Sequence, residues 1–541
     1  MTESAEKDVR RLGQLKGERL PHEPVWRNVF EYMAPERAHG FNGNVVSGTD
    51  IQAQKARVLD GTATHSARLF SSGMASGLHP SNSLWFGMDA GGENEEENQF
   101  FDNAARIIFE NIHAANFDAV AAECHADLGP AGWFVLYTDE KEGGGYHFEQ
   151  WPLAQCFIAC SKPGDLVDTI FREFELTLEQ AVNEYGLTNL SSALQDKYKL
   201  GGEALGEKIW FVWAIYPRSI YVEGGAKLAK NKAFASCHHE VATKKMVRES
   251  GYDEFPCAVG RWRLVPGTPY AMGPGSDALP DIKTLNQIIE LELANMDIAV
   301  SGMWKATNDG VYNSKTTRLG ARKVVMVANM DNFQPLKTGA DFNVAFSKAD
   351  QLRASIRQTL LADILQPQDG PQMTATEVHA RQQLIRQQLA PIFARLQSEF
   401  LQPLIVRCFF IALRAGILGK VPDSLRGRNF TVKYTSPMAR SQRLEEVTAI
   451  DNVIAGMVQA IALDPAGAQD VLDLIIMPDA QRKRAEALGV AASLMRSPDQ
   501  IKARRDARTQ AADAAQAQAQ NAQMAGMASE QMIKSALPAA A

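Results

Sequence analysis

Residues 374–416, TATEVHARQQLIRQQLAPIFARLQSEFLQPLIVRCFFIALRAG, have the pattern of one long helix that prolines bend. The segment opens with a capping box, because the Thr374 hydroxyl and the Glu377 carboxylate can each bind a free backbone N–H at the helix start. Gly416 supplies a left-handed stop at the other end. Between them an apolar stripe lies on one helical face, at Ile385, Leu389, Ile392, Leu396 and Phe400.

The length and the prolines of this helix bear on its role. At about 1.5 Å per residue it spans roughly 60 Å, about twice the width of a small domain. Pro391 and Pro403 lie inside it, and each removes a backbone hydrogen bond and bends the axis. Such a helix fits either a strut that crosses the layers of a large assembly or a scaffold helix of an ordinary all-α domain.

Composition excludes several classes of protein. The chain has 541 residues, 45% of them hydrophobic and 22% charged, which is typical of a folded protein of several domains. Its net charge of −7 argues against a protein that wraps nucleic acid by bulk charge, because such a protein carries a basic surplus. We expect no signal peptide in the polar N-terminus and no membrane span, since Arg407 and Arg414 interrupt the most apolar run, 403–418. Six irregularly spaced cysteines fit a reduced, cytosolic origin.

The period of the apolar residues changes after a helical N-terminal part. Helices are expected at 23–33, within 51–78 and at 97–128. From Gly132 the alternation predicts a hairpin that turns at Gly143-Gly144-Gly145. Further short elements are expected as strands at 157–159, 167–174, 210–216, 234–237 and 244–249 and as a helix at 176–185. Residues 130–265 should therefore form an α+β part with a small mixed sheet.

Two helices flank a compact insert in the second half of the chain. They are expected at 279–300 and 346–365, around an irregular insert, 301–345, in which Lys and Arg outnumber Asp. A helix-breaking loop, 366–373, precedes the long helix. Beyond that helix we expect a strand and several helices, at 430–434, 442–463, 470–476 and 478–488. The Ala/Gln-rich tail has almost no large apolar residue, so it is either helical against copies of itself or disordered.

No constellation of catalytic or metal-binding residues stands out, and we expect neither an enzyme nor a cofactor. The chain has no GxxxxGK[ST] loop for a nucleotide and no GxSxG elbow for a nucleophilic serine. Cys156 and Cys160 have no second cysteine pair at zinc-ligand spacing. Cys237-His238-His239 would point alternate side chains in opposite directions if extended, and an ordinary loop is favoured there over a metal site. Glu173 and Glu175 share a strand face, where paired carboxylates are usually only solvated.

An ordered series of short motifs resembles the head-to-tail connector, or portal, family of short-tailed bacteriophages over nearly the whole chain. The most specific match is Thr374-Ala375-Thr376-Glu377-Val378 with Arg381, Pro391, Glu399 and Pro403-Leu404. Ala271 departs from the family, in which glycine is common at that place. The other motifs that carry the resemblance are Trp26 with Pro35, Asp60-Gly61-Thr62-Ala63, Ser76-Gly77-Leu78, Trp85-Phe86, Arg261-Trp262, Tyr270 to Gly275, Leu279 to Asn286, Tyr434 to Ala439 and Gln442-Arg443.

The resemblance implies a predominantly α-helical α+β portal fold that forms a ring, typically of twelve copies, around a central channel at one capsid vertex. Double-stranded DNA would enter through the channel during packaging and leave through it at infection. In this layout the expected regions are a wing (1–278 and 374–436), a stem of two helices (279–300 and 346–365), a clip (301–345), a tunnel loop (366–373), a crown (437–500) and a C-terminal barrel or disordered tail (501–541).

The same resemblance assigns residues to the channel and to docking. A polar to acidic tunnel loop, with Gln366, Gln368, Asp369 and Gln372, suits a low-friction bore, because each neutralised phosphate adds salt-dependent affinity. Lys348, Arg353 and Arg357 on the second stem helix contact phosphates or pair with Asp350, Asp363 or acids of a neighbouring subunit. The basic clip residues Lys315, Arg318, Arg322 and Lys323 hold DNA, dock an acidic partner or are solvated.

The implied partners are further copies of the chain, the terminase large subunit, tail or adaptor proteins, and capsid and scaffolding proteins, with no membrane. The protein would be made in the bacterial cytoplasm and reside in the virion at the portal vertex. Two alternatives stay open at this point. One is a neck or tail adaptor ring without a channel function, and the other is a DNA-packaging enzyme such as a terminase subunit.

Overall fold

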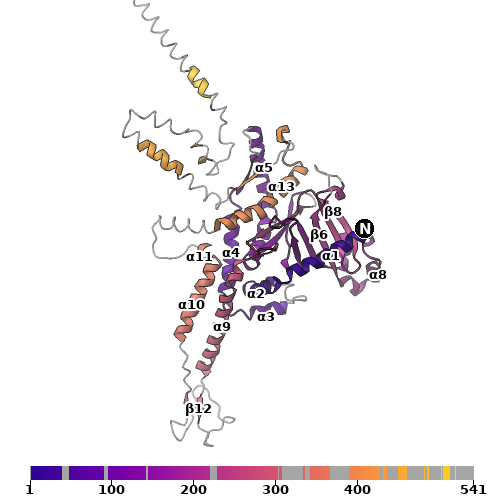
Figure 1. Cartoon of the computed structure of the whole chain (residues 1–541), viewed down its shortest axis with the longest axis vertical. Coiled ribbons are helices and arrows are strands. Elements are labelled where there is room, and N and C mark those ends of the chain that lie inside the picture. Colours follow the sequence, from indigo (N-terminus) through magenta and orange to yellow (C-terminus); the bar gives the residue numbers. More distant parts are fainter. Residues whose placement is uncertain are drawn as a thin grey trace, which may run out of the picture. The chain divides into compact units, whose positions relative to one another are not determined.

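The chain is seen here in a computed structural model (Figure 1). It describes residues 2–38, 48–89, 95–141, 144–219, 228–301, 304–306, 333–335, 342–365, 389–425, 431–434, 447, 449–459, 480–481, 484–485, 501, 504–511, 514 and 518. The described residues fall in two compact units. The first lies within Met1–Ser83 and Ile108–Ile417, and the second within Leu84–Ile107 and Leu418–Ala541.

The helices of the first unit carry apolar stripes that face its core. In α2 (Glu23–Met33) the buried residues Trp26, Val29, Phe30 and Met33 recur at helical spacing. The other helices before the sheets are α1 (Thr2–Arg19), α3 (Gly48–Lys55), α4 (Thr62–Leu78) and α6 (Phe117–Ala131). Helix α5 (Glu95–Ala114) begins in the second unit, and its residues from Ile108 onward belong to the first. The helices within or after the sheets are α7 (Leu178–Tyr185), α8 (Ser192–Leu200), α9 (Pro274–Ser301), α10 (Phe342–Thr359), α11 (Ala362–Leu365) and α13 (Gln402–Arg414).

Two antiparallel sheets replace the single mixed sheet expected from the sequence. The larger one has the order β4-β5-β6-β7-β8, and the smaller one β3-β2-β9. All strand pairs in these two sheets are antiparallel, including β2 with β9, which are far apart in the sequence. The strands are β2 (Trp133–Glu140), β3 (Tyr146–Gln150), β4 (Cys156–Ala159), β5 (Thr169–Thr177), β6 (Lys208–Pro217), β7 (Phe234–Glu240), β8 (Lys245–Tyr252) and β9 (Cys257–Arg261).

The core beside these sheets is rich in aromatic side chains. Trp26, Trp133 and Tyr270 are fully buried, and their ring centroids lie 5.3–5.5 Å apart. They bring together α2, β2 and the segment before α9, so residues far apart in the sequence share one cluster. On the larger sheet, Leu12 and Leu15 of α1 pack against residues of β4, β5 and β6, and Figure 1 shows α1 alongside that sheet.

The second unit has a small sheet of its own. Strands β1 (Phe86–Asp89) and β14 (Thr431–Tyr434) pair antiparallel, with Phe86 opposite Tyr434. This pairing confirms the strand expected near residue 430 and joins segments about 350 residues apart. Trp85 and Phe86 are fully buried and meet edge to face.

Several expected helices are confirmed and others are divided. The helix expected at 97–128 is two helices, α5 and α6, and the one expected at 346–365 is α10 followed by α11. At the second break Leu361 has φ +59°, a left-handed conformation that an α-helix cannot continue through. Its neighbours Leu360 and Ala362 are both buried, so the turn directs both into the core.

The long helix is confirmed where the structure describes it, over Leu389–Arg414, whereas 374–388 lies outside the described residues. A π-helical turn, Gln397–Leu401, precedes Pro403, and such a turn accommodates the missing N–H of a proline. Gly416 has φ +73°, the left-handed stop that was expected. By length and composition this is one helix that could cross a membrane, but 61% of its apolar window is buried inside the protein, as in the core helix of a soluble protein.

Candidate functional site

The base of α9 is held by a close contact between glycines. A Cβ on Gly273 would lie 2.4 Å from the Gly129 carbonyl oxygen, and a Cβ on Gly132 would lie 2.1 Å from the Met272 carbonyl carbon. Gly132 also has φ +82°, which disfavours any other residue. The Met272-Gly273-Pro274 turn therefore starts α9 in direct backbone contact with the end of α6.

Helices α9 and α10 lie side by side as the helix pair expected at 279–300 and 346–365 (Figure 1). Ile282 and Leu285 of α9 share a buried cluster with Leu352 and Ile356 of α10. Val29 of α2 belongs to the same cluster, together with Met33, Ala63 and Ala67. Apolar burial thus fixes the half of the pair at the start of α9 and the end of α10 against α2 and α4.

Polar contacts fasten the same pair. Asp281 of α9 accepts a hydrogen bond from the Ser355 hydroxyl of α10 at 2.6 Å. Arg353 of α10 donates to Asp60 at 3.0 Å and to Asp350 at 2.9 Å. Burial acts to raise the pKa of Asp60, but the hydrogen bonds from Thr62 and Arg353 outweigh it and lower that pKa. The hydrogen bond to Asp60 in turn raises the pKa of Arg353.

The three basic residues expected on the stem therefore differ. Arg353 is engaged within its own subunit, which confirms the pairing alternative for that residue. Arg357 lies 3.9 Å from Asp363, and both side chains are exposed to solvent. Lys348 is exposed and forms no ion pair with any described residue. Contact of Lys348, Arg353 or Arg357 with DNA stays a prediction.

Large apolar side chains remain exposed on the far half of the helix pair. Leu291, Leu293 and Met296 of α9 are each more than half exposed, and Phe346 of α10 is 48% exposed. Leu291 to Met296 covers more than one turn of α9. Several large apolar side chains exposed on neighbouring turns of a helix often mark a contact with another molecule.

At the end of the pair, β12 (Trp304–Ala306) and β13 (Phe333–Pro335) form an antiparallel ribbon. The basic residues predicted for the clip, Lys315, Arg318, Arg322 and Lys323, lie outside the described residues. The predicted tunnel-loop residues Gln366, Gln368, Asp369 and Gln372 do so as well. Their roles stay predictions.

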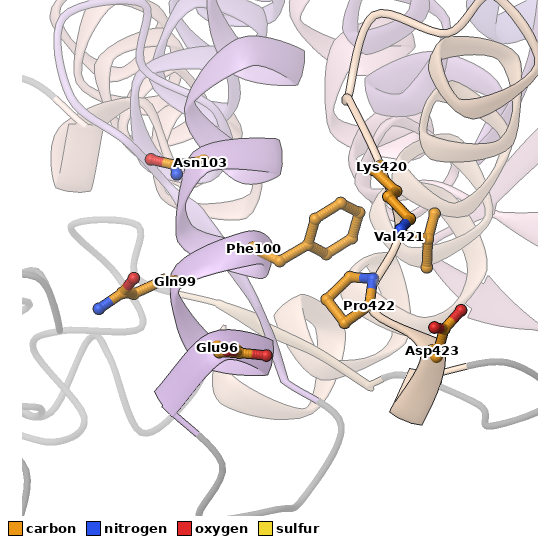
Figure 2. Close-up of a pocket in the computed structure, with 8 residues that line it drawn as sticks. All are labelled: Glu96, Gln99, Phe100, Asn103, Lys420, Val421, Pro422 and Asp423. Atoms are coloured by element: carbon orange, nitrogen blue, oxygen red, sulfur yellow. The ribbon is translucent and has the colours of Figure 1, made fainter.

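A pocket of about 450 Å³ lies in the second unit, between α5 and the chain before residue 424 (Figure 2). Phe100 of α5 faces Pro422 across it. The remaining lining residues are Glu96, Gln99, Asn103, Lys420, Val421 and Asp423. This mixture of polar and apolar groups has no nucleophile paired with a base, so it gives no support to a catalytic function.

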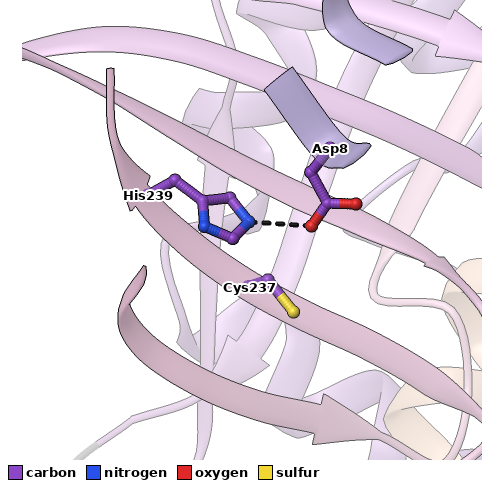
Figure 3. Close-up of side chains that lie close together, drawn as sticks. All are labelled: Asp8, Cys237 and His239. Carbon is purple, nitrogen blue, oxygen red and sulfur yellow. Dashed lines mark hydrogen bonds and ion pairs between the residues drawn. The ribbon is translucent and has the colours of Figure 1, made fainter. Parts of the chain in front are cut away.

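Asp8, Cys237 and His239 come together beneath α1, and all three are buried (Figure 3). The expected loop at 237–239 is wrong, because these residues lie within β7. Asp8 Oδ2 lies 2.8 Å from His239 Nε2. Burial raises the pKa of Cys237 to about 12, although its hydrogen bond with Tyr216 acts in the opposite direction. Sequence spacing gave Cys237 and His239 a shared strand face, but nothing in the sequence pointed to Asp8.

The two carboxylates that the sequence places on one strand face, Glu173 and Glu175, each lie within ion-pair distance of a lysine. Glu173 forms an ion pair with Lys16 at 2.7 Å, and Glu175 lies 3.2 Å from Lys208. All six cysteines are free thiols in this structure. Cys156 begins β4 and Cys160 follows its last residue, and burial raises the pKa of both thiols.

Comparison with known proteins agrees with the resemblance found in the sequence motifs. The family described as bacteriophage head to tail connecting protein matches residues 6–495. The chain belongs to this family. The head-to-tail connector predicted from the sequence is therefore confirmed.

Two curated relatives span nearly the same length as this chain. The portal protein of Salmonella phage epsilon15 is 26% identical over 95% of this chain and 93% of its own length. The probable portal protein of Bordetella phage BPP-1 is 26% identical over 94% of this chain and 91% of its own. This connector is thus similar to phage portal proteins from end to end.

Solved structures from gene transfer agent particles also match, with 13% identity. The neck of an empty particle covers 72% of this connector and 86% of the matched chain, at a TM-score of 0.32. The match to a chain from the virion of a native particle covers 72% of this connector and 89% of the matched chain, at a TM-score of 0.29. At such low TM-scores, neither likeness carries an argument about this connector.

Proposed function

We propose that this connector is the portal of a bacteriophage, a homo-oligomeric ring at one capsid vertex whose axial channel passes double-stranded DNA. The end-to-end similarity to proteins named portal protein is the observation that carries the proposal. The ring would join the capsid to the tail, dock the terminase large subunit during packaging and afterwards bind tail or adaptor proteins.

The helix pair supports the ring. Leu291, Leu293 and Met296 are large, apolar and exposed in a single chain, and burial of each against a neighbouring subunit would stabilise the ring by about 1–2 kcal/mol. In a closed ring this contribution is repeated at every interface. We assign α9 and α10 to the stem on this ground, and residues between them, including β12 and β13, to the clip that faces the motor and then the tail.

The charge of the chain suits a conduit for DNA. A net charge of −7 per subunit and few free basic groups on the described part of α10 would keep phosphate binding weak. Lys348 is the described stem residue best placed to form a sparse basic ring, because it is exposed and forms no ion pair with a described residue. We propose that the predicted loop at 366–373 narrows the bore.

The remaining regions follow the layout predicted from the sequence. The wing would comprise 1–278 and 374–436, the crown 437–500, and the tail 501–541 a barrel or an unstructured end. The function is structural rather than catalytic, and it requires no cofactor. Synthesis in the bacterial cytoplasm and encounters with capsid and scaffolding proteins would precede incorporation in the virion.

Locating the protein in purified virions tests this proposal against the adaptor alternative. An asymmetric cryo-electron microscopy reconstruction should show its ring at a single vertex, in contact with the capsid shell, with DNA on its axis. A ring found wholly outside the shell, separated from the packaged DNA by another ring, would identify an adaptor instead. Nucleotide hydrolysis by the purified protein would indicate the packaging enzyme.

A further inference from the structure

Strand β7 presents Cys237 and His239 to the layer between the larger sheet and α1. The register pairs Cys237 with Ala214 and His239 with Val212 on β6. Ala214 and Val212 belong to the apolar cluster that contains Leu12 and Leu15 of α1. His238, between them, faces the opposite side and bonds with Tyr185 at 3.0 Å. Alternation along the strand thus places one thiol and one imidazole together under α1.

Helix α1 adds a carboxylate to these two groups. Asp8, Cys237 and His239 are no more than 7% exposed, and their ligand atoms lie within 4.8 Å of one another. Figure 3 shows Asp8 reaching from α1 toward His239, with Cys237 beside them on the same strand. The Tyr216 hydroxyl donates to Asp8 at 3.4 Å, so a fourth oxygen borders the cluster.

The hydrogen bonds among these groups do not satisfy all of them. His239 Nε2 is bonded to Asp8, but His239 Nδ1 is buried and has no hydrogen-bond partner among the described residues. A buried polar atom without a partner costs about 1–3 kcal/mol. Of the three side chains only the imidazole lacks a partner for one of its polar atoms, and its Nδ1 is turned away from Asp8, so the ring nitrogen that can bind an ion in this cluster is Nε2 (Figure 3).

We propose that Asp8, Cys237 and His239 bind a zinc ion that fastens α1 to the larger sheet. Sulfur, imidazole nitrogen and carboxylate oxygen are the three donors that zinc takes in proteins, and the set is too soft for magnesium or calcium. A tetrahedral ion needs its donors about 3–4 Å apart, which these side chains reach with shifts of about 1 Å. The fourth position falls to water or to Tyr216.

The position of the site in the chain gives the ion a structural role. Asp8 is about 230 residues from Cys237 and His239 in sequence, so one ion would close a very long loop. Without it, the middle of α1 is held by Leu12 and Leu15 and by the ion pair of Lys16 with Glu173, while Arg19 anchors its C-terminal end to backbone carbonyls of residues 153–156. Metal binding would therefore suppress local opening of α1 more than opening of the rest of the first unit.

Cobalt substitution tests the proposal directly. Full-length protein without an affinity tag is stripped with a chelator, dialysed, and titrated with Co²⁺ and separately with Zn²⁺. We expect one ion per chain, tetrahedral Co²⁺ absorption and a thiolate-to-cobalt charge-transfer band. Hydrogen exchange of residues 2–19 should slow when Zn²⁺ is added.

Two variants and a thiol control make the result specific. Cys237→Ser keeps the size of the side chain and should abolish the charge-transfer band, whereas Cys160→Ser, a cysteine outside the cluster, should retain it. Asp8→Asn should weaken Zn²⁺ binding by at least about tenfold, and it provides a second reading if Cys237→Ser does not fold. Wild-type protein that takes up no more Zn²⁺ than Asp8→Asn, or a cobalt spectrum unchanged by Cys237→Ser, would overturn the proposal.

Discussion

Arg261 and Glu399 form a buried, two-pronged ion pair. Arg261 Nε lies 2.7 Å from Glu399 Oε2, and Arg261 Nη2 lies 2.9 Å from Glu399 Oε1. The pair joins β9 to the π-helical turn of the long helix, which Pro403 follows. The bend in the long helix is thus tied to the smaller sheet at one defined point.

Removing Glu399 should leave the Arg261 charge buried with only the carbonyls of Asp165 and Pro269 and the Cys160 sulfur as partners. Burial is the main influence on Glu399 and raises its pKa, even though Arg261 acts in the opposite direction. We expect Glu399→Ala to lower the free energy of unfolding by about 3–5 kcal/mol. Urea unfolding followed by tryptophan fluorescence measures the change.

Glu184→Ala provides the control for this variant. Glu184 pairs with Arg248 at 2.9 Å, and both side chains are about half exposed. Because solvent screens such a pair, its loss should cost less than about 1 kcal/mol. Equal effects of the two substitutions would show that the Arg261–Glu399 pair has no special part in holding the long helix.

Alanine substitutions at Gly132 and Gly267 distinguish the effect of steric collision by the added Cβ from the effect of a left-handed backbone. Both have φ +82°, but a Cβ on Gly132 would collide with Met272 and one on Gly267 would meet nothing within 4 Å. Gly267→Ala should cost about 1–2 kcal/mol, the usual penalty of a left-handed alanine. Gly132→Ala should cost several kcal/mol more and displace the start of α9.

Thermal unfolding and the yield of assembled rings would report this difference. Gly132→Ala is expected to reduce both, whereas Gly267→Ala should assemble normally. If the two variants unfold at the same temperature, the close backbone contact at the base of α9 does not determine the position of the stem.

Substitution of Lys348 and of Arg353, both on α10, should have different effects on stability. Lys348→Ala should change the free energy of unfolding by less than about 0.5 kcal/mol, because the side chain is exposed. Arg353→Ala should lower it by about 1–3 kcal/mol, because it removes the bond to the buried Asp60. In a packaging assay, Lys348→Ala rings should form normally and retain less DNA. Full DNA retention by Lys348→Ala particles would count against contact of this residue with DNA.

His79 and His125 make stability depend on pH. Their Nε2 atoms lie 2.8 Å apart, both rings are buried, and Phe400 meets each of them edge-on. Burial lowers the pKa of His79 to about 4 and that of His125 well below 6.5, and the His79 charge lowers the latter further. The nearby ionisable pair is His113 with Asp118, 2.9 Å apart.

The direction of the change in stability with pH follows from the protons that the folded and the unfolded chain bind. Between pH 6.5 and 4 the unfolded chain protonates these imidazoles and the folded chain does not, so stability falls as the pH falls. His79 alone should account for a loss of about 3 kcal/mol on going from neutral pH to pH 4.

Unfolding midpoints measured at pH 7, 5.5 and 4.5 would test this dependence. His79→Gln should flatten the curve in this range relative to wild type, while exposed His147→Gln should leave the curve unchanged. A His79→Gln curve parallel to that of wild type would show that the buried pair does not determine the acid sensitivity.

Local patterns in the sequence predicted most of the individual elements. The helix expected at 23–33, with Trp26, Phe30 and Tyr32, is α2, and the glycines at 143–145 predicted the turn between β2 and β3. The predictions that were wrong concern features that depend on contacts between distant segments. The division of the second stem helix at Leu361 follows from burial of both its neighbours, which no local pattern reports.

In the candidate site, too, the elements could be predicted from the sequence but the contacts between distant segments could not. Helices were expected from the sequence at 279–300 and 346–365, but the bond of Arg353 to Asp60 joins positions 293 residues apart. The meeting of Asp8 with Cys237 and His239 likewise requires α1 to lie on the larger sheet. Identification of the family rested instead on the order of short motifs along the chain. Part of that order now has a physical reason in the packing of Trp26, Arg261, Tyr270 and Gly273.

Electron microscopy of the purified, assembled protein tests the central claim most directly. Reconstruction along the ring axis should show a closed ring, typically of twelve subunits, with an axial channel surrounded by α9 and α10 and with Leu291, Leu293 and Met296 buried between neighbouring subunits. A stable monomer or dimer under several assembly conditions, or a ring whose stem leaves these side chains exposed and has no continuous bore, would contradict it.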